Sequence, residues 1–224
     1  MDESEILGLI DRLTYTFIEG GFLMIKNIVF DLGNVLVDFD PIRFIREKTA
    51  DEKQQKLLMK EIFGSVDWLR FDKGTITNQE LLLSVTARLP KDLHGITEEL
   101  LTTWYHGLHP LPQMAELPQQ LKDQGLGIYL LSNAPQDFYL FEETIPSYSA
   151  FDGIFISSDW KLAKPEHQIF RTFYSHFQLN PAECYFIDDS APNILAAEET
   201  GMRGFHFRKD YSDLKQNLSQ FIQL

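Results

Sequence analysis

Short apolar runs alternate with longer amphipathic stretches along most of this chain. The runs are rich in β-branched and aromatic residues and cover 28–30, 127–131, 153–156, 184–187 and 204–207. Between them, apolar residues recur at helical spacing over 114–123, 136–145, 166–177 and 193–200. Strands buried on both faces that alternate with helices are typical of parallel βαβ units. The pattern therefore predicts the α/β class, as a three-layer αβα sandwich around a parallel sheet.

The interval from residue 41 to about residue 106 shows apolar residues at helical spacing only, for example Leu58 and Ile62. It includes a predicted capping box, with Thr77 as the N-cap and Glu80 three residues later. No strand pattern interrupts it, so we expect a small all-helical unit inserted after the first strand. The expected organisation is an N-terminal extension at 1–23, a core at 24–40 and 111–224, and a helical unit at 41–110.

Composition narrows the classes of partner. The 224 residues are 44% hydrophobic, enough for a sizeable core, and carry a formal net charge of −13. Such an acidic chain argues against nucleic acid and anionic membrane surfaces, and no stretch approaches the roughly 18 apolar residues of a membrane span. Residues 1–23 lack the basic region of a secretory signal. The single cysteine, Cys184, excludes an internal disulfide and fits a reducing compartment, so we expect a cytoplasmic protein. Its oligomeric state stays open between a monomer and a homodimer.

Polar side chains of different chemistry follow the predicted strands. Because the carboxyl ends of parallel strands lie at one edge of a sheet, where α/β proteins bind ligands, these side chains should converge. Lys164, directly before Pro165, adds a cation to the group. The candidate site residues at strand ends are Asp31 after the first strand, Ser132 and Asn133 after the second, and Asp188 with Asp189 after the fourth.

This combination of groups suits phosphate chemistry. Three clustered carboxylates would repel one another without a cation, and a hard divalent ion with oxygen ligands, Mg²⁺, would resolve that repulsion. A metal-bound phosphate then fits, with Ser132 and backbone amides donating hydrogen bonds and Lys164 neutralising charge. Asp31 would be free to attack phosphorus and form an aspartyl-phosphate.

Four short motifs in this order resemble those of the haloacid dehalogenase-like hydrolase superfamily. They are Phe-Asp-Leu-Gly-Asn-Val at 30–35, Leu-Ser-Asn at 131–133, Lys-Pro-Glu at 164–166, and Phe-Ile-Asp-Asp at 186–189 followed by Asn193. The resemblance covers about residues 25–208 and implies a Rossmann-like core with a helical cap between the first two motifs, matching 41–110. The segment 68–74 is similar to the cap loop that faces the active site in this family.

The resemblance also implies roles for these residues. Asp31 would be the nucleophile, Ser132 and Asn133 would bind phosphate, and Lys164 would steady both the phosphate and the nucleophile. The implied metal ligands are Asp31, the carbonyl of Gly33, and Asp189, with Asp188 beside it. These roles predict an Mg²⁺-dependent phosphatase that acts on a small phosphorylated metabolite, for example a sugar phosphate.

The first motif departs from most phosphatases of the family at Gly33, where they carry a second Asp as general acid and base. The glycine carbonyl can still meet a metal, but neither Gly33 nor the amide of Asn34 can transfer a proton. General acid–base assistance is worth about 10²–10⁴-fold. The sequence Asp-Leu-Gly-Asn-Val is similar to bacterial glucose-1-phosphate phosphatases, whose anomeric leaving group needs less protonation. We therefore predict a preference for sugar 1-phosphates, aryl phosphates or acyl phosphates over simple alkyl esters.

Two other functions stay open at this point. A 2-haloacid dehalogenase resembles this chain in fold and also lacks the second Asp, but such enzymes use no metal and lack a pair like Asp188 and Asp189. A catalytically weak, ligand-binding member of the family is favoured only by Gly33. Trp68, Phe71 and Trp104 would either pack in the interior or stack on a sugar at the mouth of the cap.

Overall fold

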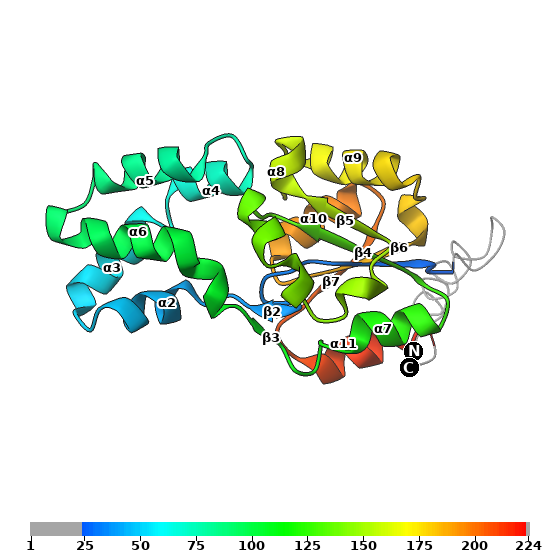
Figure 1. The fold of residues 1–224 in the computed structure, drawn as a ribbon. Coiled ribbons are helices and arrows are strands. Elements are labelled where there is room, and N and C mark those ends of the chain that lie inside the picture. Colours follow the sequence, from blue (N-terminus) through cyan, green and yellow to red (C-terminus); the bar gives the residue numbers. More distant parts are fainter. Residues whose placement is uncertain (1–23, 223–224) are drawn as a thin grey trace, which may run out of the picture.

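A five-stranded parallel sheet forms the centre of the protein. The computed structural model describes residues 24–222, and Figure 1 shows the sheet with helices on both faces and a separate group of helices to its left. The strands are β1 (Asn27–Phe30), β4 (Gly127–Ser132), β5 (Gly153–Ile156), β6 (Cys184–Asp188) and β7 (Arg203–His206). Their spatial order is β5-β4-β1-β6-β7, and every neighbouring pair is parallel. The predicted α/β class is confirmed.

The helices form two layers because successive residues of a strand point to opposite faces of the sheet. In β1, Ile28 and Phe30 belong to one buried cluster, whereas Val29 belongs to another. The helices against the first face are α7 (Leu117–Asp123) and α11 (Tyr211–Leu218); those on the other face are α8 (Ser157–Trp160), α9 (His167–Phe177) and α10 (Ala191–Glu199). The result is the three-layer αβα sandwich expected from the sequence.

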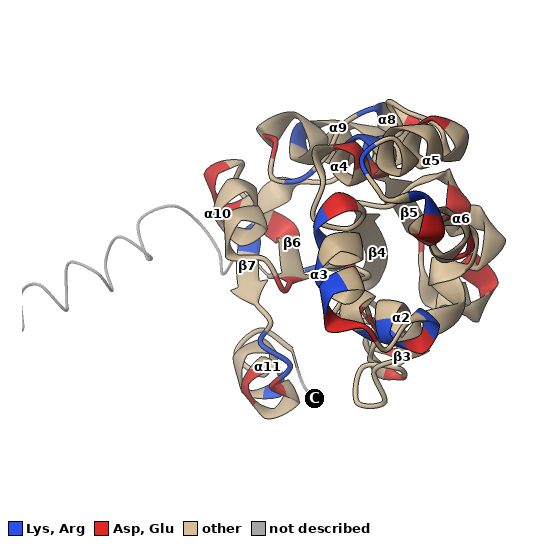
Figure 2. Ribbon diagram, turned by 90° about the vertical axis from the view of Figure 1, so that its left-hand side faces the viewer, with Lys and Arg blue, Asp and Glu red and all other residues tan. Residues whose placement is uncertain are grey.

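The elements between residues 41 and 103 are all helical, and we call residues 41–107 the helical insert. Its helices are α2 (Pro41–Lys48), α3 (Glu52–Glu61), α4 (Val66–Asp72), α5 (Asn78–Thr86) and α6 (His94–Thr103). The predicted capping box is confirmed, because Thr77 accepts from the backbone N–H of Glu80 and the Glu80 carboxylate accepts from that of Thr77. Figure 2 shows acidic and basic residues occurring along the same helix of the insert, α3.

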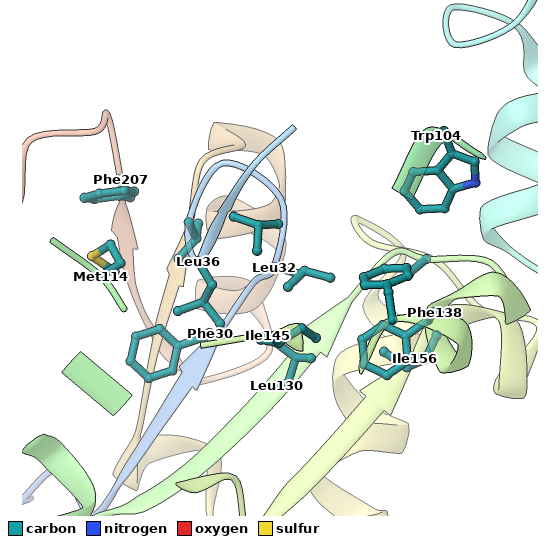
Figure 3. Close-up of a cluster of buried hydrophobic side chains, with 14 of the residues drawn as sticks. Phe30, Leu32, Leu36, Trp104, Met114, Leu130, Phe138, Ile145, Ile156 and Phe207 are labelled. Atoms are coloured by element: carbon teal, nitrogen blue, oxygen red, sulfur yellow. The ribbon is translucent and has the colours of Figure 1, made fainter. Parts of the chain in front are cut away.

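The interior of the insert is continuous with one face of the sheet. Trp104, at the end of the insert, belongs to the same buried cluster as Phe30 and Leu130 of the sheet. Figure 3 shows Trp104 above Phe138 and Ile156, and Leu32 of the loop after β1 belongs to the same cluster. This shared core fixes the insert over the carboxyl edge of the sheet, where the candidate site residues were expected.

A short ribbon joins the insert to the sheet. Strand β2 (Val37–Asp38) leads into the insert and pairs antiparallel with β3 (His109–Pro110), which leads out of it. Arg43 reinforces this junction, with Nη1 donating to the Asp38 carboxylate at 2.6 Å and Nη2 to the carbonyl of Gly107 at 2.9 Å. The chain therefore enters and leaves the insert at neighbouring points.

One predicted helix is absent from the structure, and one predicted segment lies outside the described residues 24–222. The stretch 136–145, predicted as one helix, forms two short 3₁₀ helices, Gln136–Leu140 and Glu142–Thr144, separated at Phe141, whose φ of −137° is not helical. The break lets Phe138, Phe141 and Ile145 all turn into the core. The N-terminal extension expected at 1–23 lies outside the described residues. Within the described residues, no helix has the length and apolar character needed to cross a membrane.

Candidate active site

The sheet brings every predicted site residue to one edge. Strand β1 lies between β4 and β6, with Phe30 paired in register to Leu130 on one side and Ile187 on the other. Asp31 therefore follows the central strand, while Ser132 ends one neighbouring strand and Asp188 ends the other. All three side chains are buried or nearly so, with Asp31 the most accessible at 8%.

Lys164 is the centre of the charge network. Its Nζ lies 2.8 Å from Oδ1 of Asp31 and 2.7 Å from Oδ2 of Asp188, and it donates to the carbonyl of Leu131 at 2.9 Å. The side chain is 1% exposed, so all three ammonium hydrogens are used inside the protein. Burial alone would lower the pKa of Lys164, but the charges of Asp188 and Asp31 raise it. Lys164 therefore stays charged and fixes the position of the Asp31 carboxylate.

The segment that carries Lys164 is held by Asn133. The side chain of Asn133 donates to the carbonyl of Lys164 at 2.9 Å and accepts from its backbone N–H at 2.8 Å. Both ends of the Asn133 amide are thus engaged with backbone. The hydroxyl of Ser132, by contrast, makes no hydrogen bond with any described residue, so Ser132 has a free donor at this edge while the Asn133 side chain does not.

Asp188 is anchored at the start of α10. Its carboxylate accepts from the backbone N–H of Ser190 at 2.8 Å and from the side chain of Asn193 at 3.0 and 3.1 Å, in addition to the bond from Lys164. Asn193 lies in the first turn of α10, so its two side-chain bonds tie the end of β6 to the start of that helix. Asp188 is therefore the fixed support of Lys164.

The three carboxylates form a group suited to a hard cation. One oxygen from each of Asp31, Asp188 and Asp189 lies within 4.8 Å of the others. Burial is the main cause that raises the pKa of Asp31 to about 7, and Asp188 adds to it while Lys164 opposes it. Burial and the charge of Asp188 also raise the pKa of Asp189, against a hydrogen bond from Asn34. Such carboxylate repulsion is relieved by a divalent ion with oxygen ligands.

The backbone after Asp31 adds one more oxygen. Asn34 has a left-handed φ of 56°, a conformation that Asn tolerates better than most residues. The turn is closed by hydrogen bonds from Asn34 N–H to the carbonyl of Val37 and from Val37 N–H to that of Leu32. The carbonyl of Gly33 accepts no hydrogen bond from the described residues. It is thus available to a ligand beside Asp31 and Asp189.

A cavity of about 80 Å³ opens between this edge and the helical insert. Aromatic side chains form much of its wall: Trp68 stacks on Phe39 with ring centroids 6.4 Å apart, and Trp104 packs against both Trp68 and Phe141 at 5.7 Å. The lining residues are Leu32, Gly33, Val37, Phe39, Trp68, Asp72, Trp104, Leu108, Ser132, Asn133, Ala134, Pro135 and Phe141. The cavity is therefore mainly apolar, with its polar groups near Ser132 and at Asp72.

Sequence reasoning missed three residues of this site. Asn34 hydrogen-bonds Asp189, Asp72 brings a carboxyl from the insert, and Ser157 connects the two parts through its hydroxyl. The segment 68–74 was singled out as facing the site, so Asp72, its one acidic residue, could have been found. Cys184 is buried as expected, and burial raises the pKa of its thiol to about 12.

Comparison with known proteins agrees with this geometry. The family model "haloacid dehalogenase-like hydrolase" matches residues 25–201. The chain belongs to this family. A sesquiterpene phosphatase of Aspergillus oryzae is 29% identical over 81% of this chain and 89% of its own length. A D-ribitol-5-phosphate phosphatase of Bacteroides thetaiotaomicron is 26% identical over 89% of this chain and 99% of its own. These relatives confirm the expected class of enzyme, a phosphatase of the haloacid dehalogenase-like family.

A solved structure extends the comparison. A haloacid dehalogenase-family enzyme of Bacteroides thetaiotaomicron, in complex with magnesium and inorganic phosphate, aligns with a TM-score of 0.64 at 26% identity. The alignment covers 85% of this chain and 98% of that one. A related protein of this fold thus holds the ion and the anion for which the carboxylate group and Ser132 are suited here.

Proposed function

We propose that this protein is an Mg²⁺-dependent phosphatase that hydrolyses a small phosphorylated metabolite through an aspartyl-phosphate. The observation that carries the proposal is the carboxylate of Asp31, held 2.8 Å from the ammonium of Lys164 beside the cavity that the free hydroxyl of Ser132 lines. A nucleophile fixed by a cation and facing hydrogen-bond donors is what attack on a phosphate ester requires. The haloacid dehalogenase alternative explains neither the pair Asp188–Asp189 nor the phosphatase relatives.

Each residue has a defined part in this reaction. Asp31 attacks phosphorus, forming a P–O bond while the ester P–O bond breaks, and water then hydrolyses the aspartyl-phosphate and frees Asp31. Ser132 donates a hydrogen bond to the phosphoryl group, and Lys164 compensates its charge. Asp31, the carbonyl of Gly33, and Asp189 would hold Mg²⁺, whose charge would stabilise the phosphoryl oxygens when it is bound. We assign Asp188 to support Lys164, because its oxygens already accept hydrogen bonds.

The cavity bears on the choice of substrate. Its wall of Phe39, Trp68, Trp104 and Phe141 favours an organic part with a ring or an apolar face, as an aryl, isoprenoid or pyranose group would offer. The relatives act on a sesquiterpene and on a ribitol phosphate by their names, so they do not select one of these. A sugar 1-phosphate, the substrate expected from Gly33, offers a ring that can pack on this wall. Its anomeric leaving oxygen also needs less protonation than that of an ordinary alcohol. We place the reaction in the cytoplasm, consistent with the unpaired, buried Cys184.

The test is phosphate release from p-nitrophenyl phosphate and glucose 1-phosphate, with Mg²⁺ or with EDTA. We expect turnover that needs Mg²⁺ and that falls on the order of 10⁴-fold or more in Asp31→Asn, as when other catalytic nucleophiles are removed. Asp92→Asn, at an exposed position of the insert, is the matched control and should behave as wild type. Metal-independent release, or equal activity in Asp31→Asn, would refute the proposed mechanism.

A further inference from the structure

The proposed reaction leaves one proton unaccounted for. When the ester P–O bond of an ordinary alcohol breaks, the departing oxygen needs a proton, and an unassisted alkoxide is a poor leaving group. Gly33 and Asn34, next to the nucleophile, carry no group that titrates. Among the described residues that line the cavity, Asp72 has the only ionisable side chain. It comes from the end of α4 in the insert, while Ser132 and Gly33 line the cavity from the sheet.

The backbone of Asp72 is tied directly to the phosphate-binding edge. The hydroxyl of Ser157, at the start of α8, donates to the carbonyl of Asp72 at 2.5 Å. The same hydroxyl accepts from the backbone N–H of Ala134 at 2.9 Å, and Ala134 stands two residues after Ser132. One buried serine therefore links the insert to the loop that carries the free hydroxyl of the site.

The residues that follow Asp72 add two further attachments. Lys73 forms an ion pair with Glu166, two residues beyond Lys164. Gly74 has a left-handed φ of 66°, and a Cβ at this position would lie 2.5 Å from the carbonyl oxygen of Ser158. The segment 72–74 thus packs so closely on the core that only glycine fits. These contacts set the place of the Asp72 carboxyl relative to the reacting edge.

The surroundings of Asp72 favour the protonated acid. No ion pair reaches its carboxyl from any described residue. Burial is the main cause that raises the pKa of Asp72 well above its ordinary value; a hydrogen bond from Trp68 lowers it, and the charge of Asp31 raises it further. A neutral carboxyl in an apolar cavity can donate a proton and afterwards accept one.

We propose that Asp72 is the general acid and base of this enzyme, supplied by the insert in place of the residue missing at Gly33. As Asp31 forms its bond to phosphorus and the ester P–O bond breaks, the Asp72 carboxyl gives its proton to the leaving oxygen. The Asp72 carboxylate then takes a proton from the water that attacks the aspartyl-phosphate; the P–O bond to Asp31 breaks, inorganic phosphate leaves, and Asp72 is neutral again. The inference rests on the proposed function, and it removes the restriction to acidic leaving groups that Gly33 alone implies.

The test compares leaving groups of one shape. p-Nitrophenyl, phenyl and benzyl phosphate all offer a ring to the aromatic wall, but their leaving oxygens need a proton increasingly in that order. In Asp72→Asn we expect kcat/KM, which reports formation of the aspartyl-phosphate and release of the leaving group, to fall about 10²–10⁴-fold for benzyl phosphate and less than about tenfold for p-nitrophenyl phosphate. The kcat values of Asp72→Asn should fall for all three substrates, because hydrolysis of the shared aspartyl-phosphate also uses Asp72 as its base. Asp92→Asn, on the same insert, should leave all three rates unchanged.

The outcomes separate this inference from the function on which it rests. Equal loss of kcat/KM on all three substrates would show a merely structural role for Asp72 and overturn the inference, as would no loss of kcat/KM on any of them. Asp72→Ser provides a second variant without the amide, should Asp72→Asn fail to fold, and the same dependence on leaving group is expected. No Mg²⁺-dependent turnover of any substrate by the wild type would refute the proposed function itself.

Discussion

Replacing Lys164 by Met tests the charge network at the centre of the site. The substitution keeps the length of the apolar stem and removes only the ammonium. Asp31 and Asp188 then lose partners at 2.8 and 2.7 Å, and the carbonyl of Leu131 loses a donor at 2.9 Å. Because the side chains of Lys164 and Asp188 are 1% and 0% exposed, water cannot replace these bonds without rearrangement of the core.

The loss of stability expected in Lys164→Met follows from the burial of the ion pairs that Lys164 makes. Removing one partner of a buried ion pair costs about 3–5 kcal/mol in the free energy of unfolding, because an unpaired charge stays in the interior. An exposed pair is worth about 0–1 kcal/mol. Lys26→Met is the matched control, since Lys26 also contacts a carboxylate at 2.8 Å, that of Glu183, but is 59% exposed. Lys164→Met should therefore cost several times as much as Lys26→Met.

The assay is urea denaturation of both variants and the wild type, with EDTA present so that no metal replaces the ammonium. The cost of Lys164→Met should also grow with pH. Burial already holds the folded pKa of Asp31 near 7, above the ordinary 3.8, and the loss of Lys164 raises it further. Such a group stabilises the fold when protonated, and this contribution is lost as pH rises through the folded pKa. We expect a smaller cost at pH 6 than at pH 8.5.

Two results would contradict this reasoning. If Lys164→Met costs no more than Lys26→Met, the buried network does not stabilise the fold. If the cost is independent of pH, the carboxylates beside Lys164 do not remain as unpaired charges in the variant.

Two further predictions concern the insert. Gly74→Ala should lower the free energy of unfolding, measured by urea denaturation, by at least about 1 kcal/mol more than Gly125→Ala does, because both positions have a left-handed φ but only Gly74 lies against the core. A turnover assay should show that only Gly74→Ala impairs catalysis. Equal costs would mean that the segment 72–74 is not tightly packed. Thr77→Ala should lower the free energy of unfolding by about 1 kcal/mol, because it removes the capping box. Thr102→Ala, at an exposed helical position, should leave that free energy unchanged or raise it slightly. Thermal unfolding of both variants measures the difference.

The sheet and most of its edge could be predicted because their signals are local. A buried strand is a run of apolar residues, and the carboxyl end of each run places Asp31, Ser132 and Asp188 without knowledge of their partners. The stretch 136–145 was predicted wrongly because apolar residues at 138, 141 and 145 satisfy helical spacing as well as two 3₁₀ turns.

The partners of the site residues could not be predicted in the same way. Asn133 holds the backbone of Lys164, 31 residues away, and Ser157 holds that of Asp72, 85 residues away. Such contacts depend on how distant segments pack, and a single sequence contains no local signal for them. The division of work between Asp188 and Asp189 also depends on packing, since both residues follow the same strand.

The ribbon of β2 and β3 has a consequence for how this enzyme could diversify. Asp38 and His109 face each other across this ribbon, so the insert is attached to the sheet as one long loop whose two ends are adjacent. Closing a loop between adjacent ends depends only weakly on its length, so another helical unit could replace this one without moving a strand. Asp31, Ser132 and Lys164 would stay in place, whereas Trp68 and Trp104 of the aromatic wall would be exchanged together with Asp72. One exchangeable insert would then determine both substrate choice and proton supply, while the residues that bind phosphate at the carboxyl edge of the sheet stay unchanged.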